Sequence, residues 1–92
     1  MGVQTHELKT WGSYWDAVSS GEKVFEVRRD DRGFQKGDVL HLVRMRQNYD
    51  GKWVEDRDHN NGRRVLVRKI SYVLTGGQLG IEPGYVVMGL KK

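Results

Sequence analysis

The segment from Gly21 to Arg32 places charges of both signs inside a stretch that otherwise has the character of a strand. Successive side chains on a strand point to opposite faces, so Glu26 and Arg28 share one face and can pair. Phe25 and Val27 would then face the core. An ionised group that leaves water without a partner is costly. We therefore expect the face that carries Glu26 and Arg28 to line a cleft.

Lys23 is a second cation in this segment, and its position decides what it can reach. Lys23 and Glu26 are three residues apart and would point to opposite faces of a regular strand. Lys23 can join Glu26 only if it lies in the turn before the strand, or if a bulge redirects it. The sequence is compatible with either arrangement of Lys23.

The types of Lys23, Glu26 and Arg28 support three functional hypotheses. In a binding module, Glu26 pairs with both cations and holds a rigid polar cleft, with Trp11 at its mouth. In an enzyme, Lys23 buried among cations gives up its proton readily, and Glu26 acts as general base on a small nucleoside-like amide. In a purely structural network, the charges pair with one another and take no ligand.

Composition indicates one small basic domain that spans residues 1–92. The chain carries a net charge of +4 and has a pI near 9.6, which favours RNA or a nucleotide as partner, although many small domains carry such a charge. It has no cysteine, as is typical of a reducing compartment. It also has no apolar run of the ~20 residues that a bilayer requires. We expect a cytoplasmic monomer that does not bind membranes.

Basic and aromatic residues outside the cleft segment are candidate nucleic-acid contacts. We expect residues 46–62 to be a long polar loop, either a hairpin or an irregular excursion, and Trp53 within it could stack on a base or fold back on the domain. Arginine side chains next to this loop and after the charged strand are suited to phosphate. The predicted contacts are Arg29, Arg32, Arg63, Arg64 and Trp53.

The sequence predicts neither a metal ion nor a cofactor. Residues 56–62 resemble the start of a calcium loop, but the glycine is one position late and Val67 stands where a bidentate glutamate is needed. His6, His41 and His59 lack zinc-like spacing. We expect His41 to be a hydrogen-bonded wall residue of its strand. The glycines at 76, 77 and 80 precede no helix, so they do not form a nucleotide-binding loop.

Hydrophobic patterning predicts an α+β domain, or a small β-barrel, of about five or six strands with one short N-terminal helix. Trp15 and Val18 recur at helical spacing, and Gly21 stands where a helix C-cap glycine belongs. Val3 and Leu8 are expected to reach the core from the first strand. The helix is predicted over 11–20, and the strands over 3–9, 24–29, 39–43, 63–74 and 85–90.

Several motifs along the chain resemble one known family. They are Gly21-x-Lys23-x-x-Glu26-x-Arg28, Lys36-Gly37-Asp38-Val39-Leu40, His6-x-Leu8-Lys9, Gly62-Arg63 and Gly84-Tyr85-Val86-Val87. Together they resemble the ASCH domain of the PUA-like superfamily, and more narrowly its DUF3850 branch of bacteria and phages. The resemblance implies a PUA-like pseudo-barrel that binds RNA, with Lys23, Glu26 and Arg28 lining a cleft.

The resemblance also implies an alternative function. Some ASCH relatives are amidohydrolases that act on acetylated cytidine nucleosides with a lysine, a threonine and a distal glutamate. Lys23 matches the lysine, but Glu26 occupies the threonine position, and Glu82 is a poor match for the glutamate. We therefore expect RNA or nucleotide binding in preference to catalysis. If the chain is an enzyme, Lys23 and Glu26 are its candidate catalytic residues.

Overall fold

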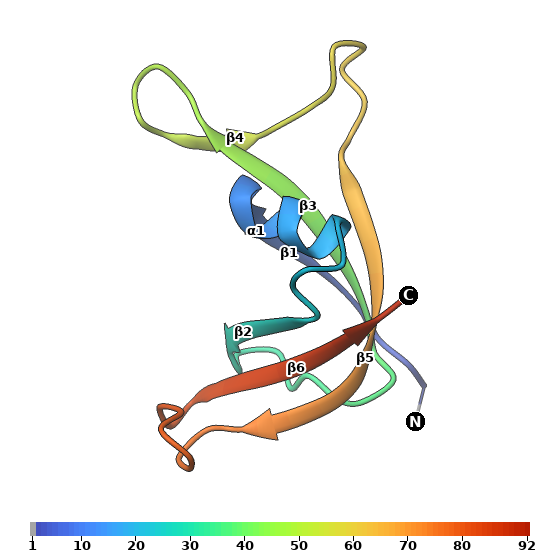
Figure 1. The fold of residues 1–92 in the computed structure, drawn as a ribbon, viewed down its shortest axis with the longest axis vertical. Coiled ribbons are helices and arrows are strands. Elements are labelled where there is room, and N and C mark those ends of the chain that lie inside the picture. Colours follow the sequence, from blue (N-terminus) through green and yellow to red (C-terminus); the bar gives the residue numbers. More distant parts are fainter. Residues whose placement is uncertain (1) are drawn as a thin grey trace.

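The computed structural model describes residues 2–92, which form six strands and one helix (Figure 1). This confirms a mostly-β domain with a short N-terminal helix. The elements are β1 (Thr5–Trp11), α1 (Gly12–Ser19), β2 (Phe25–Arg29), β3 (Val39–Gln47), β4 (Trp53–Glu55), β5 (Val65–Thr75) and β6 (Tyr85–Lys91). No helix within residues 2–92 is long and apolar enough to cross a membrane.

The strands form one sheet in the order β1-β3-β5-β6-β2, and β4 pairs with the far part of β3. β1 runs parallel to β3, and the other neighbours are antiparallel. β1 and β2 therefore stand at the two ends of the sheet. Backbone pairing among residues 2–92 does not join these two ends, so the sheet is open. Side chains alone bridge the seam: Arg28 reaches Thr10, and Arg32 reaches the Glu7 carbonyl.

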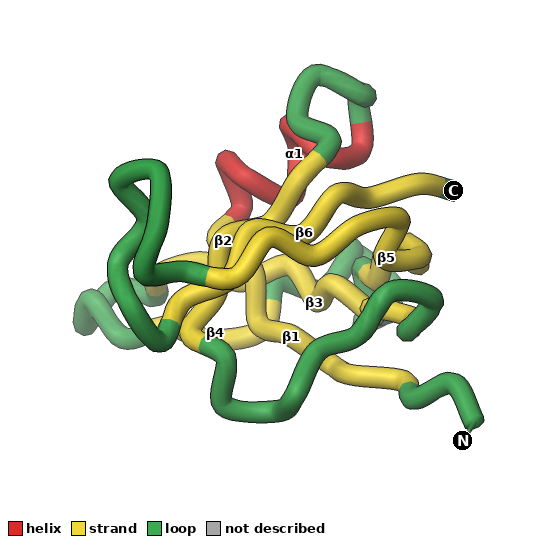
Figure 2. The backbone as a smooth tube through the Cα atoms, turned by 90° about the horizontal axis from the view of Figure 1, so that it is seen from below, coloured by secondary structure: helices red, strands yellow, loops and turns green. Residues whose placement is uncertain are grey.

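The core lies where β3, β5 and β6 meet beneath α1. Leu40, Leu42, Ile70 and Met88 are completely buried there. α1 packs against β1 and β3, and Figure 2 shows it on one side of the strands. Trp15 packs on this core and donates from its indole Nε1 to the Leu42 carbonyl at 2.9 Å. The helical spacing of Trp15 and Val18 thus corresponds to the side of α1 that packs on the core.

α1 begins after Trp11 and ends at the predicted glycine. Gly21 has a φ of +85°, and its N–H donates to the Val18 carbonyl. Glycine adopts this left-handed conformation without the steric penalty that other residues meet. The helix therefore stops where the chain must turn toward β2, which places Lys23 in the turn before that strand.

The orientation of β2 was predicted wrongly. Glu26 is 3% exposed, whereas Phe25 and Val27 are 43% and 51% exposed. The alternation is as predicted, but the charged face points inward and the apolar face outward. Two cations neutralise the Glu26 carboxylate, which removes most of the penalty for burying it.

Three smaller predictions also need correction. The first strand covers Thr5–Trp11, and Val3 before it is exposed, so it contributes nothing to the core. The strand predicted over 39–43 is longer, because β3 continues to Gln47, and its far part pairs with β4 in a hairpin, one of the two forms predicted for residues 46–62. His41 is half-buried, and its side chain makes no hydrogen bond with residues 2–92. The buried, hydrogen-bonded histidine is His6, which contacts Asp38.

Candidate ligand-binding cleft

A cleft of about 600 Å³ opens at the seam between β1 and β2, beside the start of α1. Its lining comes from both edge strands, from α1 and from the turn before β2. Interior side chains are accessible here because the sheet is not closed at this point. The lining residues are Lys9, Thr10, Trp11, Tyr14, Lys23, Phe25, Glu26, Val27 and Arg28.

Glu26 organises the polar part of the cleft. Its Oε1 accepts a hydrogen bond from Lys23 Nζ at 2.8 Å, and its Oε2 accepts one from Arg28 Nε at 2.9 Å. The Glu26 side chain is 4% exposed, while those of Lys23 and Arg28 are 17% and 25% exposed. We call these three residues the cleft cluster. The position of Lys23 in the turn lets it reach Glu26 without a bulge.

The two cations of the cleft cluster are also held by other groups. Lys23 Nζ donates to the Phe25 carbonyl at 2.7 Å. Arg28 Nη2 donates to Thr10 Oγ1 at 3.1 Å, and Thr10 donates in turn to the Leu8 carbonyl. Arg28 Nη1 has no hydrogen-bond partner within residues 2–92. Arginine has five N–H donors, so some of its donors remain available to a ligand.

Aromatic rings form a second part of the cleft wall. The Trp11 ring stacks on Tyr14, with centroids 5.6 Å apart, and on Trp53, with centroids 5.5 Å apart. Lys23 Nζ lies 5.3 Å from the Tyr14 centroid and 4.8 Å from the Phe25 centroid, which is within cation–π range. Trp11 thus stands at the cleft as expected, and Trp53 folds back onto it.

The predicted basic contacts do not gather with the cleft cluster. Arg29 is exposed, and its guanidinium lies 5.5 Å from the Tyr85 ring centroid. Arg32 donates to the Glu7 carbonyl at 2.8 Å. Arg64 lies 3.9 Å from Asp56. None of the three lines the cleft.

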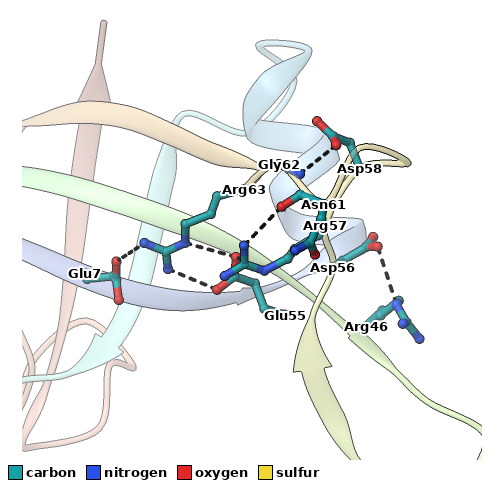
Figure 3. Close-up of polar contacts among 9 residues, drawn as sticks. All are labelled: Glu7, Arg46, Glu55, Asp56, Arg57, Asp58, Asn61, Gly62 and Arg63. Atoms are coloured by element: carbon teal, nitrogen blue, oxygen red, sulfur yellow. Dashed lines mark hydrogen bonds and ion pairs between the residues drawn. The ribbon is translucent and has the colours of Figure 1, made fainter.

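Arg63 belongs to a separate group of charges that joins β1, β4 and the start of β5 (Figure 3). Its guanidinium donates to both carboxylate oxygens of Glu55 at 3.0 Å and to Glu7 at 3.1 Å. Arg57 lies 3.4 Å from the same Glu55. Arg63 lowers the pKa of Glu55, and Glu55 with Glu7 raises the pKa of Arg63. We call Glu7, Glu55, Arg57 and Arg63 the surface cluster.

In the loop that resembled a calcium site, the Asp58 carboxylate binds backbone N–H groups of the loop itself. Asp58 Oδ1 accepts hydrogen bonds from the N–H groups of Asn60 and Gly62 at 2.9 and 2.7 Å, an Asx turn. Figure 3 shows the contact with Gly62. Within residues 2–92, no three His, Cys, Asp or Glu side chains gather in a way that could hold a metal ion.

Sequence reasoning missed several residues of the cleft. Thr10 is 2% exposed in β1 and binds Arg28, although 18 positions separate them. Tyr14, Phe25, Val27 and Lys9 also line the cleft. A usable signal for Thr10 was its position two residues after Leu8, which puts both side chains on the same face of β1, where a buried hydroxyl requires a partner. Phe25 and Val27 were missed because the sequence analysis predicted that their face of β2 points into the core.

Comparison with known proteins places this chain in a family. It is 38% identical over 58 residues to the "Uncharacterized 12.9 kDa protein in GpA 3'region" of Escherichia phage P2. That match covers 62% of this chain and 53% of the phage protein, so the chain spans about half the length of this relative. The family model "Domain of unknown function (DUF3850)" matches residues 5–90, which is nearly the whole chain. The chain therefore belongs to the DUF3850 family.

Proposed function

We propose that this chain is an RNA- or nucleotide-binding module whose ligand occupies the cleft. One observation carries the proposal: Arg28 and Lys23, fixed by the buried Glu26, line the same cleft of about 600 Å³ as the aromatic rings. This volume is typical of small-molecule sites. A nucleotide combines anionic phosphate with a flat base, and cations beside aromatic faces suit both parts.

The charge balance of the cleft supports an anionic ligand. Lys9, Lys23 and Arg28 line it, against the single carboxylate of Glu26. The net charge of these four side chains is positive. Lys23 and Arg28 are partly buried, so water screens their charges less than it screens charges on the surface. The free Nη1 of Arg28 is suited to a phosphate oxygen.

Geometry favours binding over the amidohydrolase alternative. Both oxygens of Glu26 accept hydrogen bonds from cations, so neither is free to act as a base. The Thr10 hydroxyl donates to the Leu8 carbonyl and accepts from Arg28, which is unsuitable for a nucleophile. Incubation with acylated nucleosides tests this alternative. Release of the acid by the wild type, lost in Lys23→Ala, would favour the enzyme.

We further infer a PUA-like pseudo-barrel of the ASCH type. The sheet order brings β1 and β2 to opposite ends of one sheet, yet side chains connect them. A curled sheet with a helix beside the open seam supports this assignment. An experimental structure in which the sheet is flat and β1 lies far from β2 would contradict it.

Titration with a short single-stranded RNA at two salt concentrations tests the binding function. We expect affinity to fall as salt rises, because phosphate contacts release counterions. Arg28→Ala should weaken binding about tenfold or more and reduce the salt slope. Lys36→Ala is the matched control, since it removes the same charge from an exposed turn outside the cleft. Undetectable binding at low salt, or equal loss in both variants, would refute the proposal.

A further inference from the structure

The cleft lies between two strands that each have one edge without a backbone partner. Among residues 2–92, β2 pairs only with β6 and β1 only with β3. Lys9 on β1 and Val27 on β2 both line the cleft. An unpaired strand edge presents a row of N–H and C=O groups. Some of these groups therefore face the space that a ligand would fill.

The ladder between β2 and β6 shows which groups point outward. In an antiparallel pair, residues that exchange both hydrogen bonds with their partner alternate with residues whose N–H and C=O point away. Leu90 N–H donates to the Val24 carbonyl at 2.9 Å, and Asp30 N–H donates to the Gly84 carbonyl at 2.8 Å. The even positions of β2 therefore bond to β6, and the odd position Val27 presents its backbone to the seam.

Other contacts agree with this assignment. The carbonyl of Phe25 accepts from Lys23 Nζ, and the carbonyl of Arg29 accepts from the Asp31 N–H. Both carbonyls thus have partners outside β6, as their odd positions in the ladder require. Between these two residues, Val27 lies opposite Val87 of β6 at a position whose N–H and C=O point away from that strand, and no other strand or backbone group within residues 2–92 bonds to them. A donor and an acceptor from one residue thus stand unpaired at the cleft.

We propose that the backbone of Val27 reads the edge of the nucleobase that the cleft holds. This inference rests on the proposed function. The Val27 N–H donates to an acceptor of the base, and its carbonyl accepts from a neighbouring donor. The ligand class is therefore a nucleotide whose base presents a donor next to an acceptor, while Arg28 is available to its phosphate. A ligand that leaves these groups desolvated and unpaired is rejected.

Proline at position 27 tests the donor directly. Val27→Pro removes the N–H, and this N–H makes no bond to β6, so the ladder keeps its hydrogen bonds. Strand edges tolerate proline at such positions. Val27→Ala is the matched control, because it shortens the side chain and keeps the N–H. We expect nucleotide affinity about tenfold lower for Val27→Pro than for Val27→Ala.

The probes are the four nucleoside 5′-monophosphates and ribose 5-phosphate, measured by calorimetry. We expect at least one nucleotide to bind the wild type more tightly than ribose 5-phosphate does. The two Val27 variants should bind ribose 5-phosphate equally, because it has no base edge. Equal nucleotide affinities of the two variants would overturn the base-reading role and leave the binding function intact. A wild type that binds neither nucleotides nor RNA overturns both.

Hydrogen exchange on the wild type gives a second readout that does not depend on the folding of Val27→Pro. The Val27 amide should exchange more slowly when the tightest-binding nucleotide saturates the protein. The Glu26 amide, which faces β6, should change little and serves as an internal reference. An unchanged Val27 amide at saturation contradicts the proposal.

Discussion

The cleft cluster and the surface cluster use the same ion-pair chemistry in different surroundings. In the cleft cluster, one nearly buried carboxylate, Glu26, holds two cations. In the surface cluster, Glu7 and Glu55 balance Arg57 and Arg63 (Figure 3). These four side chains are 23% to 57% exposed. The first cluster has surplus positive charge and lines a cavity. The second is neutral and connects strands.

This difference shows that an arginine count identifies a site poorly. From the sequence, Arg63 was a predicted phosphate contact and Arg28 a predicted cleft residue. In the structure, Arg63 donates to two carboxylates, whereas Arg28 shares one carboxylate with Lys23 and lines a cleft. Available donors and a cavity, more than charge alone, distinguish a binding group from a structural one.

The largest effect on stability is expected from Glu26→Gln. The substitution leaves Lys23 and Arg28 close together without a counter-charge, and breaking a buried pair in this way costs about 3 kcal/mol. Urea unfolding at pH 7 measures the loss. Glu55→Gln is the control from the surface cluster and should cost clearly less than Glu26→Gln, because its ion pairs are exposed to solvent. Equal losses from the two substitutions would remove the energetic distinction between the clusters.

Asp38→Asn tests whether a buried carboxylate outside the cleft affects stability without affecting ligand binding. Asp38 and His6 are both buried, their side chains lie 2.9 Å apart, and neither lines the cleft. Burial opposes the charge of Asp38, but the hydrogen bonds from His6 and from the N–H groups of Gln4 and Gln35 lower its pKa below the ordinary value. We expect Asp38→Asn to cost about 2 kcal/mol at pH 7 and to leave nucleotide affinity unchanged.

The lowered pKa of Asp38 also fixes the sign of a pH effect. Its contribution to stability is fully present above the unfolded pKa of about 3.9 and is lost as pH falls through the lower folded value. The difference in unfolding free energy between wild type and Asp38→Asn should therefore shrink below about pH 4. Urea unfolding from pH 7 to pH 3 measures this. A difference that stays constant over this range contradicts the assigned role of the carboxylate.

Arg63→Ala should have the smallest effect. Exposed ion pairs contribute little to stability and are screened by salt. The loss of stability should therefore decrease as the NaCl concentration rises from about 0.05 M to about 1 M. RNA affinity should match that of the Lys36→Ala control. A loss of RNA affinity as large as that of Arg28→Ala would show that the surface cluster contacts RNA and would break the comparison.

The sequence alone determined the local features of this protein. The spacing of Trp15 and Val18 predicted the helix, Gly21 predicted its end, and alternation put Glu26 and Arg28 on one face. These features depend on residues a few positions apart, whose geometry follows from the helical and strand repeats. The motif around Lys23 also led to the DUF3850 family, which the family match over residues 5–90 confirms.

Only the tertiary structure decided which face of β2 points inward and which charges remain available. Thr10 meets Arg28 across 18 positions, and Glu7 meets Arg63 across 56 positions. Such contacts follow from the order of strands in the sheet and from the curl that brings its two ends together, and no local pattern encodes either. The same long-range arrangement leaves the backbone of Val27 unpaired at the cleft. The sequence thus predicted a cleft beside Glu26 and Arg28, whereas its other walls, from β1 and α1, followed only from the tertiary structure.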